Sequence, residues 1–343
     1  MGQLNRKMRI GILSSGGDCP GINATIRGVG KSAIYHYGME VIGIHNGFTG
    51  LLNKEFEIFN ENKLSGIVNL GGTILGTSRE KPFKRMLDSD DKQKPQIIFQ
   101  NYVDMGLDCI VCIGGNGTQK TANKLSKLGI NIIGVPKTID NDVWGTDITF
   151  GFDSAVNIAT EAIDRLHSTA SSHKRVMVIE VMGHKAGWIA LYSGMAGGAD
   201  VILLPELGFK INKVAEQILQ RSSCGKSYSI VVIAEGLNMQ NGFASDYLAT
   251  EIEKITGIEA RTTVLGYTQR GGNPSPFDRN LASRLGSYAT DLIANRAFGQ
   301  MVCIKGQQVD SVELSKVAGK IKLVPSDHDL IRHGVQMGIS FGI

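Results

Sequence analysis

Apolar and polar positions alternate along the chain with two periods, one typical of buried strands and one typical of helices. Short continuous apolar runs predict strands, and apolar residues three and four apart predict helices. In the first half this pattern predicts strands at residues 8–13, 40–45, 109–113 and 130–135, with helices at about 23–37, 95–105 and 118–128. The charged segment 81–94 has neither period, and we expect it to be a mobile surface stretch.

The second half repeats the alternation after a change of pattern near residue 150. A long amphipathic helix is predicted from Ala155 to about Ser171, with Asp153 as its N-cap. Further strands are predicted at residues 175–180, 201–204 and 229–234, with helices at about 188–193, 213–221 and 246–255. Strands that alternate with helices indicate an α/β chain with mostly parallel sheets, and we expect a crossing between two domains near Phe150.

Glycine-rich segments follow two of the predicted strands at the point where each strand ends. Residues 14–21 come after the first strand, and Gly114-Gly115-Asn116-Gly117-Thr118 comes after the third. A strand, a glycine loop and a helix in this order form an anion site, because free N–H groups and the positive helix end face the ligand. The dinucleotide fingerprint G-x-G-x-x-G is absent from the first loop, which argues against a dehydrogenase.

A pair of carboxylates follows the strand at 130–135, in the segment Pro136-Lys137-Thr138-Ile139-Asp140-Asn141-Asp142. In open α/β sheets, ligands bind at the carboxyl ends of the strands, where this segment and both glycine loops lie. Backbone donors for a polyphosphate, an acid for Mg²⁺ and a base for an attacking hydroxyl are the parts that phosphoryl transfer needs. An Asp before an Asn is also a common turn former, so spacing alone leaves Asp140 open between the two roles.

Arginines stand beside further glycine segments and suit an anionic substrate. Arg79 ends a glycine-rich loop, Arg175 opens a predicted strand, and Arg261 and Arg270 flank Tyr267. Each alone is as consistent with a solvated surface side chain. Together with the glycine loops they indicate a site for a phosphorylated substrate.

Composition narrows the classes of function. The 343 residues carry 36 Lys and Arg against 32 Asp and Glu, a net charge of +4 that is too mild to indicate nucleic acid or membrane as a partner. No apolar run approaches spanning length, the first residues lack the apolar core of a signal peptide, and five scattered cysteines fit a reducing cytosol, so we expect a cytoplasmic protein. Cys109 and Cys112 have the spacing of a redox or zinc pair, but they lie in an apolar strand, so simple burial is the preferred interpretation.

Five segments in a fixed order make the chain resemble the 6-phosphofructokinase family over roughly residues 8–340. They are Ser15-Gly16-Gly17-Asp18-x-Pro20-Gly21-x-Asn23, Gly114-Gly115-Asn116-Gly117-Thr118, Pro136-Lys137-Thr138-Ile139-Asp140-Asn141-Asp142, Glu180-Val181-Met182-Gly183-His184 and Leu265-Gly266-Tyr267-Thr268-Gln269-Arg270-Gly271-Gly272. The resemblance implies a phosphofructokinase fold of two Rossmann-like α/β domains with mostly parallel sheets. The donor domain would comprise residues 1–150 and about 269–318, and the fructose 6-phosphate domain residues 151–268 and about 319–343.

The resemblance also implies a reaction, the transfer of a phosphoryl group from ATP to the 1-hydroxyl of fructose 6-phosphate. Mg²⁺ would be the cofactor, and a homotetramer would share active sites between subunits. Asp140 would be the general base, flanked by Thr138 and Asp142, with Arg79 assisting. The donor would be held by Gly16, Arg79, Glu80, Gly115, Asn116, Gly117 and Thr118, with Asn116 also near the metal. The sugar phosphate would be held by Thr138, Ile139, Asp140, Arg175, Met182, Gly183, His184, Glu235, Arg261, Tyr267, Thr268, Gln269 and Arg270, with Arg175 and Arg261 coming from a neighbouring subunit.

Several positions depart from the usual family pattern. Asn116 stands where an Asp that helps to hold Mg²⁺ is usual, and a neutral amide is a weaker ligand for this cation. Gly117 leaves room for the ATP α-phosphate, whereas pyrophosphate users typically carry Asp there, but Lys137 is typical of pyrophosphate users. We expect ATP to be the donor and give Gly117 more weight than Lys137. ATP requires that no side chain clash with its α-phosphate, and this is harder to meet than tolerance of a nearby lysine. His184 stands where Arg is usual.

Three alternatives remain beside an ATP-dependent phosphofructokinase. A pyrophosphate-dependent phosphofructokinase is favoured by Lys137. A lipid or NAD kinase could carry a similar glycine loop, but the segment around Asp140 and the set of arginines argue against it. An inactive paralogue that binds sugar phosphate and regulates a partner is suggested by Asn116 alone.

Overall fold

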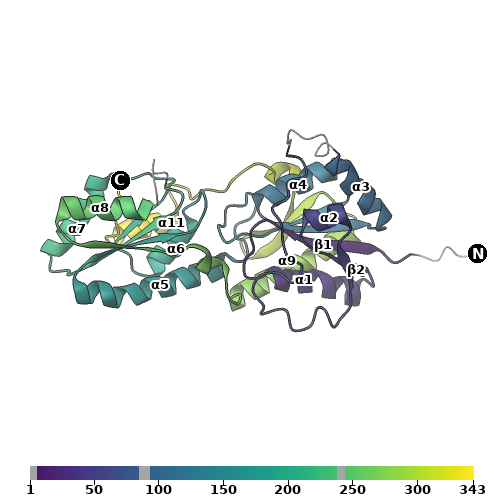
Figure 1. Ribbon diagram of the computed structural model, residues 1–343, viewed down its shortest axis with the longest axis horizontal. Helices are drawn as coiled ribbons and strands as arrows, with labels where there is room; N and C mark the ends of the chain where they lie inside the picture. Colours follow the sequence, from purple (N-terminus) through teal and green to yellow (C-terminus); the bar gives the residue numbers. More distant parts are fainter. Residues whose placement is uncertain (1–5, 85–92, 238–243) are drawn as a thin grey trace, which may run out of the picture. The chain divides into compact units, whose positions relative to one another are not determined.

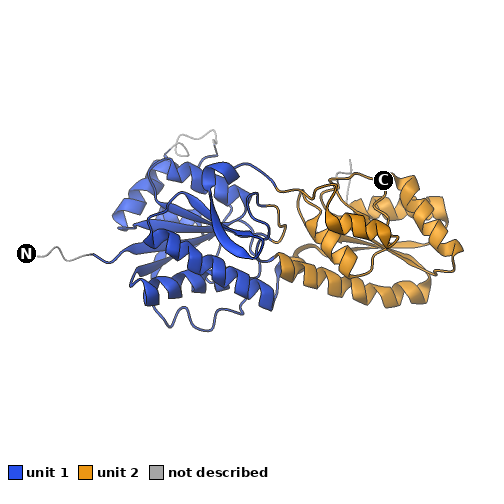
Figure 2. Cartoon of the chain, turned by 180° about the vertical axis from the view of Figure 1, so that it is seen from behind, with its two compact units in different colours: residues 1–138, 143–151, 270–321 blue, residues 139–142, 152–269, 322–343 orange. Residues whose placement is uncertain are grey.

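Two compact units make up the chain in the computed structural model, which describes residues 6–84, 93–237 and 244–343 (Figure 2). The first unit comprises residues 1–138, 143–151 and 270–321, and the second comprises residues 139–142, 152–269 and 322–343. The domain prediction placed 139–142 with the first unit, whereas these residues pack with the second. The chain therefore changes units inside the segment that carries the two carboxylates.

The first unit is built on a seven-stranded sheet with the order β11-β10-β5-β4-β1-β2-β3. Its strands are β1 (Arg9–Ser15), β2 (Glu40–Ile44), β3 (Phe56–Phe59), β4 (Cys109–Gly114), β5 (Ile132–Pro136), β10 (Gln300–Lys305) and β11 (Gln308–Glu313). The two edge strands, β3 and β11, pair antiparallel, and all other pairs are parallel. The carboxyl ends of the parallel strands therefore share one edge of the sheet.

Helices cover both faces of this sheet. They are α1 (Ile22–Lys31), α2 (Phe48–Asn53), α3 (Lys94–Asp104), α4 (Asn116–Ser126), α9 (Pro276–Ala294) and α10 (Leu314–Val317). In Figure 1, α1 and α9 lie on one face and α2, α3 and α4 on the other. The helix predicted at 23–37 ends earlier as an α-helix and continues as a π-helical turn, Ser32–His36. Most of the predicted mobile stretch 81–94 lies outside the described residues.

The second unit has a four-stranded, fully parallel sheet with the order β7-β8-β6-β9. Its strands are β6 (Val176–Val181), β7 (Val201–Leu203), β8 (Ser229–Ala234) and β9 (Ala260–Val264), and its helices are α5 (Phe152–His173), α6 (Trp188–Ala196), α7 (Ile211–Ser223), α8 (Ala244–Thr256) and α11 (Asp329–Gln336). In Figure 1, α5 lies on the opposite face of the sheet from α7 and α8. Because α5 begins at Phe152, Asp153 lies in its first turn, and its prediction as the N-cap was wrong.

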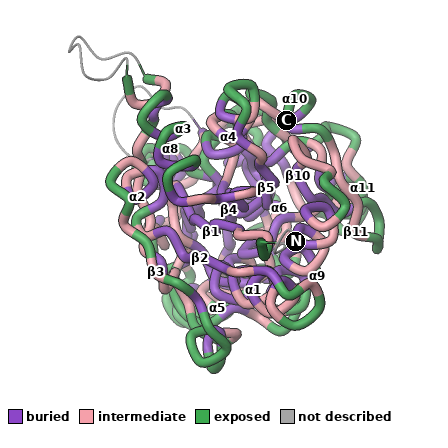
Figure 3. Tube along the Cα trace, turned by 90° about the vertical axis from the view of Figure 1, so that its right-hand side faces the viewer, coloured by how far each residue is buried: buried purple, intermediate pink, exposed green. Residues whose placement is uncertain are grey.

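Burial on both faces explains why the strands are continuous apolar runs (Figure 3). Every residue of β4, β5, β6 and β8 is buried. Cys109 and Cys112 are free thiols in this interior, and burial raises the pKa of both. This confirms the interpretation of the pair as core residues. The α/β class with mostly parallel sheets is confirmed as well, and none of the helices in the described ranges is both long enough and apolar enough to cross a bilayer.

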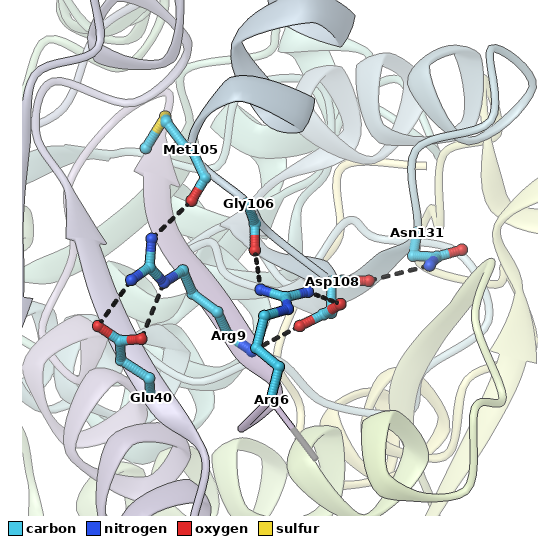
Figure 4. A network of polar contacts seen from close by, with 7 residues as sticks. All are labelled: Arg6, Arg9, Glu40, Met105, Gly106, Asp108 and Asn131. Atoms are coloured by element: carbon cyan, nitrogen blue, oxygen red, sulfur yellow. Dashed lines mark hydrogen bonds and ion pairs between the residues drawn. The ribbon is translucent and has the colours of Figure 1, made fainter. Parts of the chain in front are cut away.

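A polar network ties the amino ends of the strands in the first unit (Figure 4). Arg9, at the start of β1, makes a bidentate ion pair with Glu40, at the start of β2, with distances of 2.9 and 3.0 Å. Its backbone N–H donates to Asp108 Oδ2 at 2.7 Å, and Arg6 donates to Asp108 Oδ1 at 2.6 Å. Asn131 donates to the carbonyl of Asp108 at 2.9 Å. The amino ends are thus closed by protein contacts, and the glycine loops occupy the other edge.

Candidate active site

The first glycine loop is held against the loop that ends at Arg79, and both belong to the first unit. The N–H of Gly16 donates to the carbonyl of Ser78 at 2.9 Å, and the Thr77 hydroxyl donates to the carbonyl of Gly16 at 2.7 Å. Gly16 has a φ of 90°, in the left-handed region that favours glycine. The backbone after β1 is therefore fixed beside the residues that precede Arg79.

Asn23, the last residue of the first motif, fixes the same neighbouring loop from within α1. Its side-chain N–H group donates to the carbonyls of Leu70 and Gly71, both at 3.1 Å. Its Oδ1 accepts from the N–H of Ile74 at 2.8 Å. A buried amide that satisfies three backbone groups holds this irregular loop in one conformation.

Arg79 and Glu80, both predicted to contact the donor, follow this loop. Arg79 is exposed, and Glu80 is half-buried. Glu80 forms an ion pair with Lys94 at 3.1 Å, so part of its charge is already balanced within the first unit.

The second glycine loop leads directly into α4, whose first residue is Asn116. No side-chain hydrogen bond caps this helix start, which leaves an N-terminus of the kind that binds phosphate. The Thr118 hydroxyl donates to the carbonyl of Ser15 at 3.2 Å, which joins the two glycine loops. A Cβ placed on Gly117 would meet no atom within 4 Å, so this position faces open space.

Gln119 braces the second glycine loop, and sequence reasoning missed it. Its side-chain N–H group donates to the carbonyl of Gly114 at 2.8 Å and to the carbonyl of Val135 at 3.0 Å. The same fully buried side chain thus connects the carboxyl ends of β4 and β5. No feature of the sequence marks this glutamine as buried, so its role follows from the structure alone.

Two cations lie against the first glycine loop. Lys137 is 3% exposed, and its ammonium group donates to the carbonyl of Gly17. Arg270 donates to the carbonyl of Asp18 at 3.2 Å, and a Cβ on Gly17 would come within 2.7 Å of its guanidinium group. Sequence reasoning assigned Arg270 to the sugar phosphate, and within the first unit it contacts the donor loop. Both cations can offset phosphate charge at this loop.

The carboxylate segment follows β5. Thr138 belongs to the first unit, where its carbonyl accepts from the Thr149 hydroxyl at 2.8 Å. Ile139, Asp140 and Asp142 belong to the second unit, and their side chains are at most 8% exposed. Two carboxyl groups are therefore kept in a largely buried loop rather than on an exposed turn.

The predicted sugar-binding residues after β6 are organised by Glu235, at the end of β8. Its Oε1 accepts from the N–H of Gly183 at 3.2 Å and from the N–H of His184 at 2.7 Å. Gly183 has a φ of 148° and His184 a φ of 55°, so this turn is strained and needs such support. Met182 N–H donates to Gln269 Oε1 at 2.8 Å. The structure thus brings Met182, Gly183, His184, Glu235 and Gln269 together.

Arg175 and Arg261 meet at a shared carboxylate elsewhere in the second unit. Both guanidinium groups form ion pairs with Glu259, a residue that sequence reasoning missed. Tyr267 is 72% exposed, and the Thr268 hydroxyl donates to the carbonyl of Leu265 at 2.6 Å. No contact in the described residues joins Tyr267 or Thr268 to this pair of arginines.

Arg175 and Arg261 lie at the amino end of the sheet, away from the other predicted sugar-binding residues of the same unit. Arg175 immediately precedes β6, whereas Met182 immediately follows it. Arg261 pairs with Met177, near the same end. A strand of six residues separates Arg175 from Met182 by roughly 20 Å. One chain therefore does not bring these arginines to the residues around Met182.

The chain is similar to known proteins along nearly its whole length. The sequence matches the phosphofructokinase family over residues 9–293. It is 67% identical to a protein of Bacteroides thetaiotaomicron named ATP-dependent 6-phosphofructokinase 3, over 98% of this chain and 100% of that protein. It is 51% identical to the ATP-dependent 6-phosphofructokinase of Spirochaeta thermophila, over 97% of both chains.

Solved structures of phosphofructokinases share the fold of this chain. The crystal structure of a pyrophosphate-dependent phosphofructokinase from Marinobacter aquaeolei superposes with a TM-score of 0.84 at 26% identity, over 97% of this chain and 92% of that one. The fold, the order of the motifs and the sequence identity lead to one conclusion. The chain belongs to the phosphofructokinase family.

Proposed function

We propose that this protein is an ATP-dependent 6-phosphofructokinase, which transfers the γ-phosphoryl group of ATP to the 1-hydroxyl of fructose 6-phosphate and forms fructose 1,6-bisphosphate and ADP. The observation that carries the choice of donor is the open space at Gly117, in the first turn of α4. A nucleotide needs room beyond the two phosphates that it shares with pyrophosphate. The names of the relatives at 67% and 51% identity support the same donor.

Asp140 is the general base in this proposal. Its carboxylate takes the proton of the 1-hydroxyl while the oxygen attacks the γ-phosphorus, and the bond from that phosphorus to the β-γ bridging oxygen breaks. Thr138 lies two residues earlier, in the unit that carries the glycine loops. Two residues span at most about 7 Å of chain, so the base is tethered close to the end of the donor-binding unit.

The residues present fit Mg²⁺ as the cofactor. Within residues 6–84, 93–237 and 244–343, no three His, Cys, Asp or Glu side chains gather as a metal site. Asn116 instead offers an amide oxygen at the start of α4. This fits an ion held mainly by phosphates and water, which is how Mg²⁺ usually binds at such sites. Asn116 would hold Mg²⁺ directly or through water, and the bound ion would offset negative charge on the transferring group.

A homotetramer with shared active sites completes the proposal. Arg175 and Arg261 lie about one strand length from Met182, so they can contact the same sugar phosphate only from another subunit. Mixed assembly tests this. Tetramers formed from Asp140→Asn and Arg261→Ala subunits should regain activity that neither variant has alone. Mixtures that stay inactive would contradict shared sites.

A pyrophosphate-dependent phosphofructokinase is the second candidate, and Lys137 favours it. This lysine is buried against Gly17, where its charge can complete a site for a short polyphosphate. The same cation also suits the β- and γ-phosphates of ATP. For this reason Lys137 does not decide between the donors by itself.

The decisive experiment is a coupled assay with fructose 6-phosphate and Mg²⁺ that compares ATP with pyrophosphate. We expect turnover with ATP and a value of kcat/KM at least about a hundredfold lower with pyrophosphate, a difference of about 2.7 kcal/mol in transition-state binding. Turnover with pyrophosphate alone would assign the second function. Binding of fructose 6-phosphate without product from either donor would identify an inactive paralogue.

A further inference from the structure

Lys322 contacts the carboxylate segment from the last part of the chain. Its ammonium group donates to Asn141 Oδ1 at 2.9 Å, and its backbone N–H donates to the carbonyl of Asp142 at 2.8 Å. Both contacts lie within the second unit. We infer that Lys322 is a positioning residue for this reaction, one that fixes the segment carrying Asp140. The inference rests on the proposed role of Asp140 as the base.

The segment that Lys322 holds has an uncommon backbone conformation. Asn141 has a φ of 50°, in the left-handed region, which asparagine adopts more readily than most residues but which is uncommon outside glycine. Asn141 stands between the two carboxylate residues, so its backbone angles set the directions of Asp140 and Asp142. Lys322 contacts the side chain of Asn141 and the carbonyl of the next residue, Asp142, and these two contacts restrict the backbone of Asn141. Without them, the loop has less to keep it in this conformation.

Lys322 is itself fixed by Trp188, the first residue of α6. Its ammonium group lies 5.2 Å from the centre of the indole ring, and its carbonyl accepts from the indole N–H at 3.0 Å. Trp188 is 6% exposed, so this support is part of the core. These contacts hold Lys322 in one conformation at both its side chain and its backbone. Its hydrogen bond to Asn141 therefore costs little further rotamer freedom.

The main chain also pairs beside this contact. Ile321 and Val143, the neighbours of Lys322 and Asp142, form an isolated antiparallel bridge in the first unit. The hydrogen bond from the N–H of Lys322 to the carbonyl of Asp142 belongs to this pairing. The carboxylate segment is therefore anchored after Asp142 by a main-chain bond that no side-chain substitution removes. The side chain of Lys322 adds the contact that reaches back to Asn141.

Lys322→Met tests the side chain alone, because it keeps the backbone bonds and an apolar stem against Trp188. We expect kcat with ATP and fructose 6-phosphate to fall about tenfold to a hundredfold, with little change in either KM. Lys322→Arg keeps a cation and its donors and should recover part of kcat. Lys320→Met is the matched control, because Lys320 also lies over a tryptophan, 5.8 Å from the ring of Trp144, in the first unit.

A double-mutant cycle separates positioning from general stabilisation. Asn141→Gly removes the amide and keeps the left-handed conformation accessible. If Lys322 acts through Asn141, the kcat of the double variant should be no lower than that of the less active single variant. Additive losses would overturn the inference, and so would a Lys322→Met protein whose kcat equals that of Lys320→Met.

Hydrogen–deuterium exchange of peptides that cover residues 137–145 gives a readout that does not depend on turnover. Faster exchange in Lys322→Met than in Lys320→Met is expected, and equal exchange would reject the positioning role. A wild-type protein without turnover would instead reject the proposed function. The two failures are therefore distinguishable in one set of proteins.

Discussion

The side chain of Gln119 donates a hydrogen bond to the carbonyl of Gly114 at 2.8 Å, where β4 passes into the second glycine loop. Its other bond, to Val135 at 3.0 Å, reaches the strand that leads to the carboxylates. One buried amide thus sets the spacing between the two loops on which the proposed chemistry depends.

Gln119→Leu should weaken both the fold and donor binding. Two lost hydrogen bonds are worth about 1–3 kcal/mol of unfolding free energy, measured by urea denaturation. We expect the KM for ATP to rise severalfold while the KM for fructose 6-phosphate stays within twofold. Gly134→Ala should act in the same direction, because its Cβ would lie 2.1 Å from Gln119 Oε1.

Gln217→Leu is the control for Gln119→Leu. It removes one side-chain hydrogen bond in the second unit, from Gln217 to the carbonyl of Gly338 at 3.0 Å. That variant should leave the KM for ATP unchanged. An equal rise of this constant in both variants would show that Gln119 acts only on overall stability.

Gly117→Asp should change donor use without disturbing the fold. Gly117 is not among the residues with positive φ, and an added Cβ meets no atom, so the variant should unfold at the wild-type temperature. We expect kcat/KM for ATP to fall at least about a hundredfold, because a carboxylate in the open space at this helix start would take up room for the nucleotide and repel its phosphates. Gly117→Ala should lose less than about threefold. Undiminished use of ATP by Gly117→Asp would refute the role of this open space.

Asp140→Asn should lower kcat by about 10²–10⁴, the usual contribution of a general base. The amide matches the carboxyl group in size, so both KM values and the unfolding temperature should stay near those of the wild type. Asp142→Asn, which changes the neighbouring carboxyl group, should lose much less. A residual kcat above a tenth of the wild-type value in Asp140→Asn would exclude this residue as the base.

Glu259→Gln should raise the KM for fructose 6-phosphate about threefold to tenfold and leave kcat unchanged. Glu259 holds Arg175 and Arg261 together, and without its charge two guanidinium groups repel each other. The hydrogen bond from Arg175, followed by the charges of Arg175 and Arg261, lowers the pKa of Glu259, so the carboxylate stays ionised and this KM should not change through Glu259 between pH 6 and 8. Glu216→Gln removes another exposed ion pair of the second unit, that with Lys213, and should have no effect.

His328 should make the C-terminal helix sensitive to acid. Its Nδ1 accepts from the N–H of Leu330 at 3.2 Å, which requires the neutral ring, and burial lowers its pKa below 6.5. A lowered pKa means that the stabilisation is complete above pH 6.5 and is lost as the pH falls through the folded-state value. The difference in unfolding temperature between pH 7.5 and pH 5 should therefore be smaller in His328→Asn, which caps without titrating. An unchanged difference would show that His328 does not contribute.

Much of the site could be predicted because its chemistry lies in short segments at strand ends. The glycine loops and the segment around Asp140 follow apolar runs, and parallel strands place such segments at one edge of a sheet. Strand β9 was not predicted, because its polar residues Arg261-Thr262-Thr263 form an edge strand without an apolar run. Helix α9 was also missed, although Ser275 caps it and Pro276 opens it.

The residues that support the site could not be predicted, because their contacts join distant parts of the chain. Lys322 reaches Asn141 across 181 positions, and Glu259 meets Arg175 across 84. Gln119 is closer to its partners, but a glutamine in a polar helix has no sequence feature that marks it as buried. Such contacts depend on how helices and strands pack against one another in three dimensions, and local sequence patterns do not determine that packing.

The open space at Gly117 has an evolutionary consequence. Glycine and aspartate codons differ by one nucleotide, and at this position the change meets no steric barrier in the fold. A lineage could therefore exchange the donor by one mutation without first gaining stability. Lys137 is different, because its buried ammonium group is tied to Gly17, and replacing it would disturb the loop that any donor must use. We therefore expect that natural changes of donor begin at position 117.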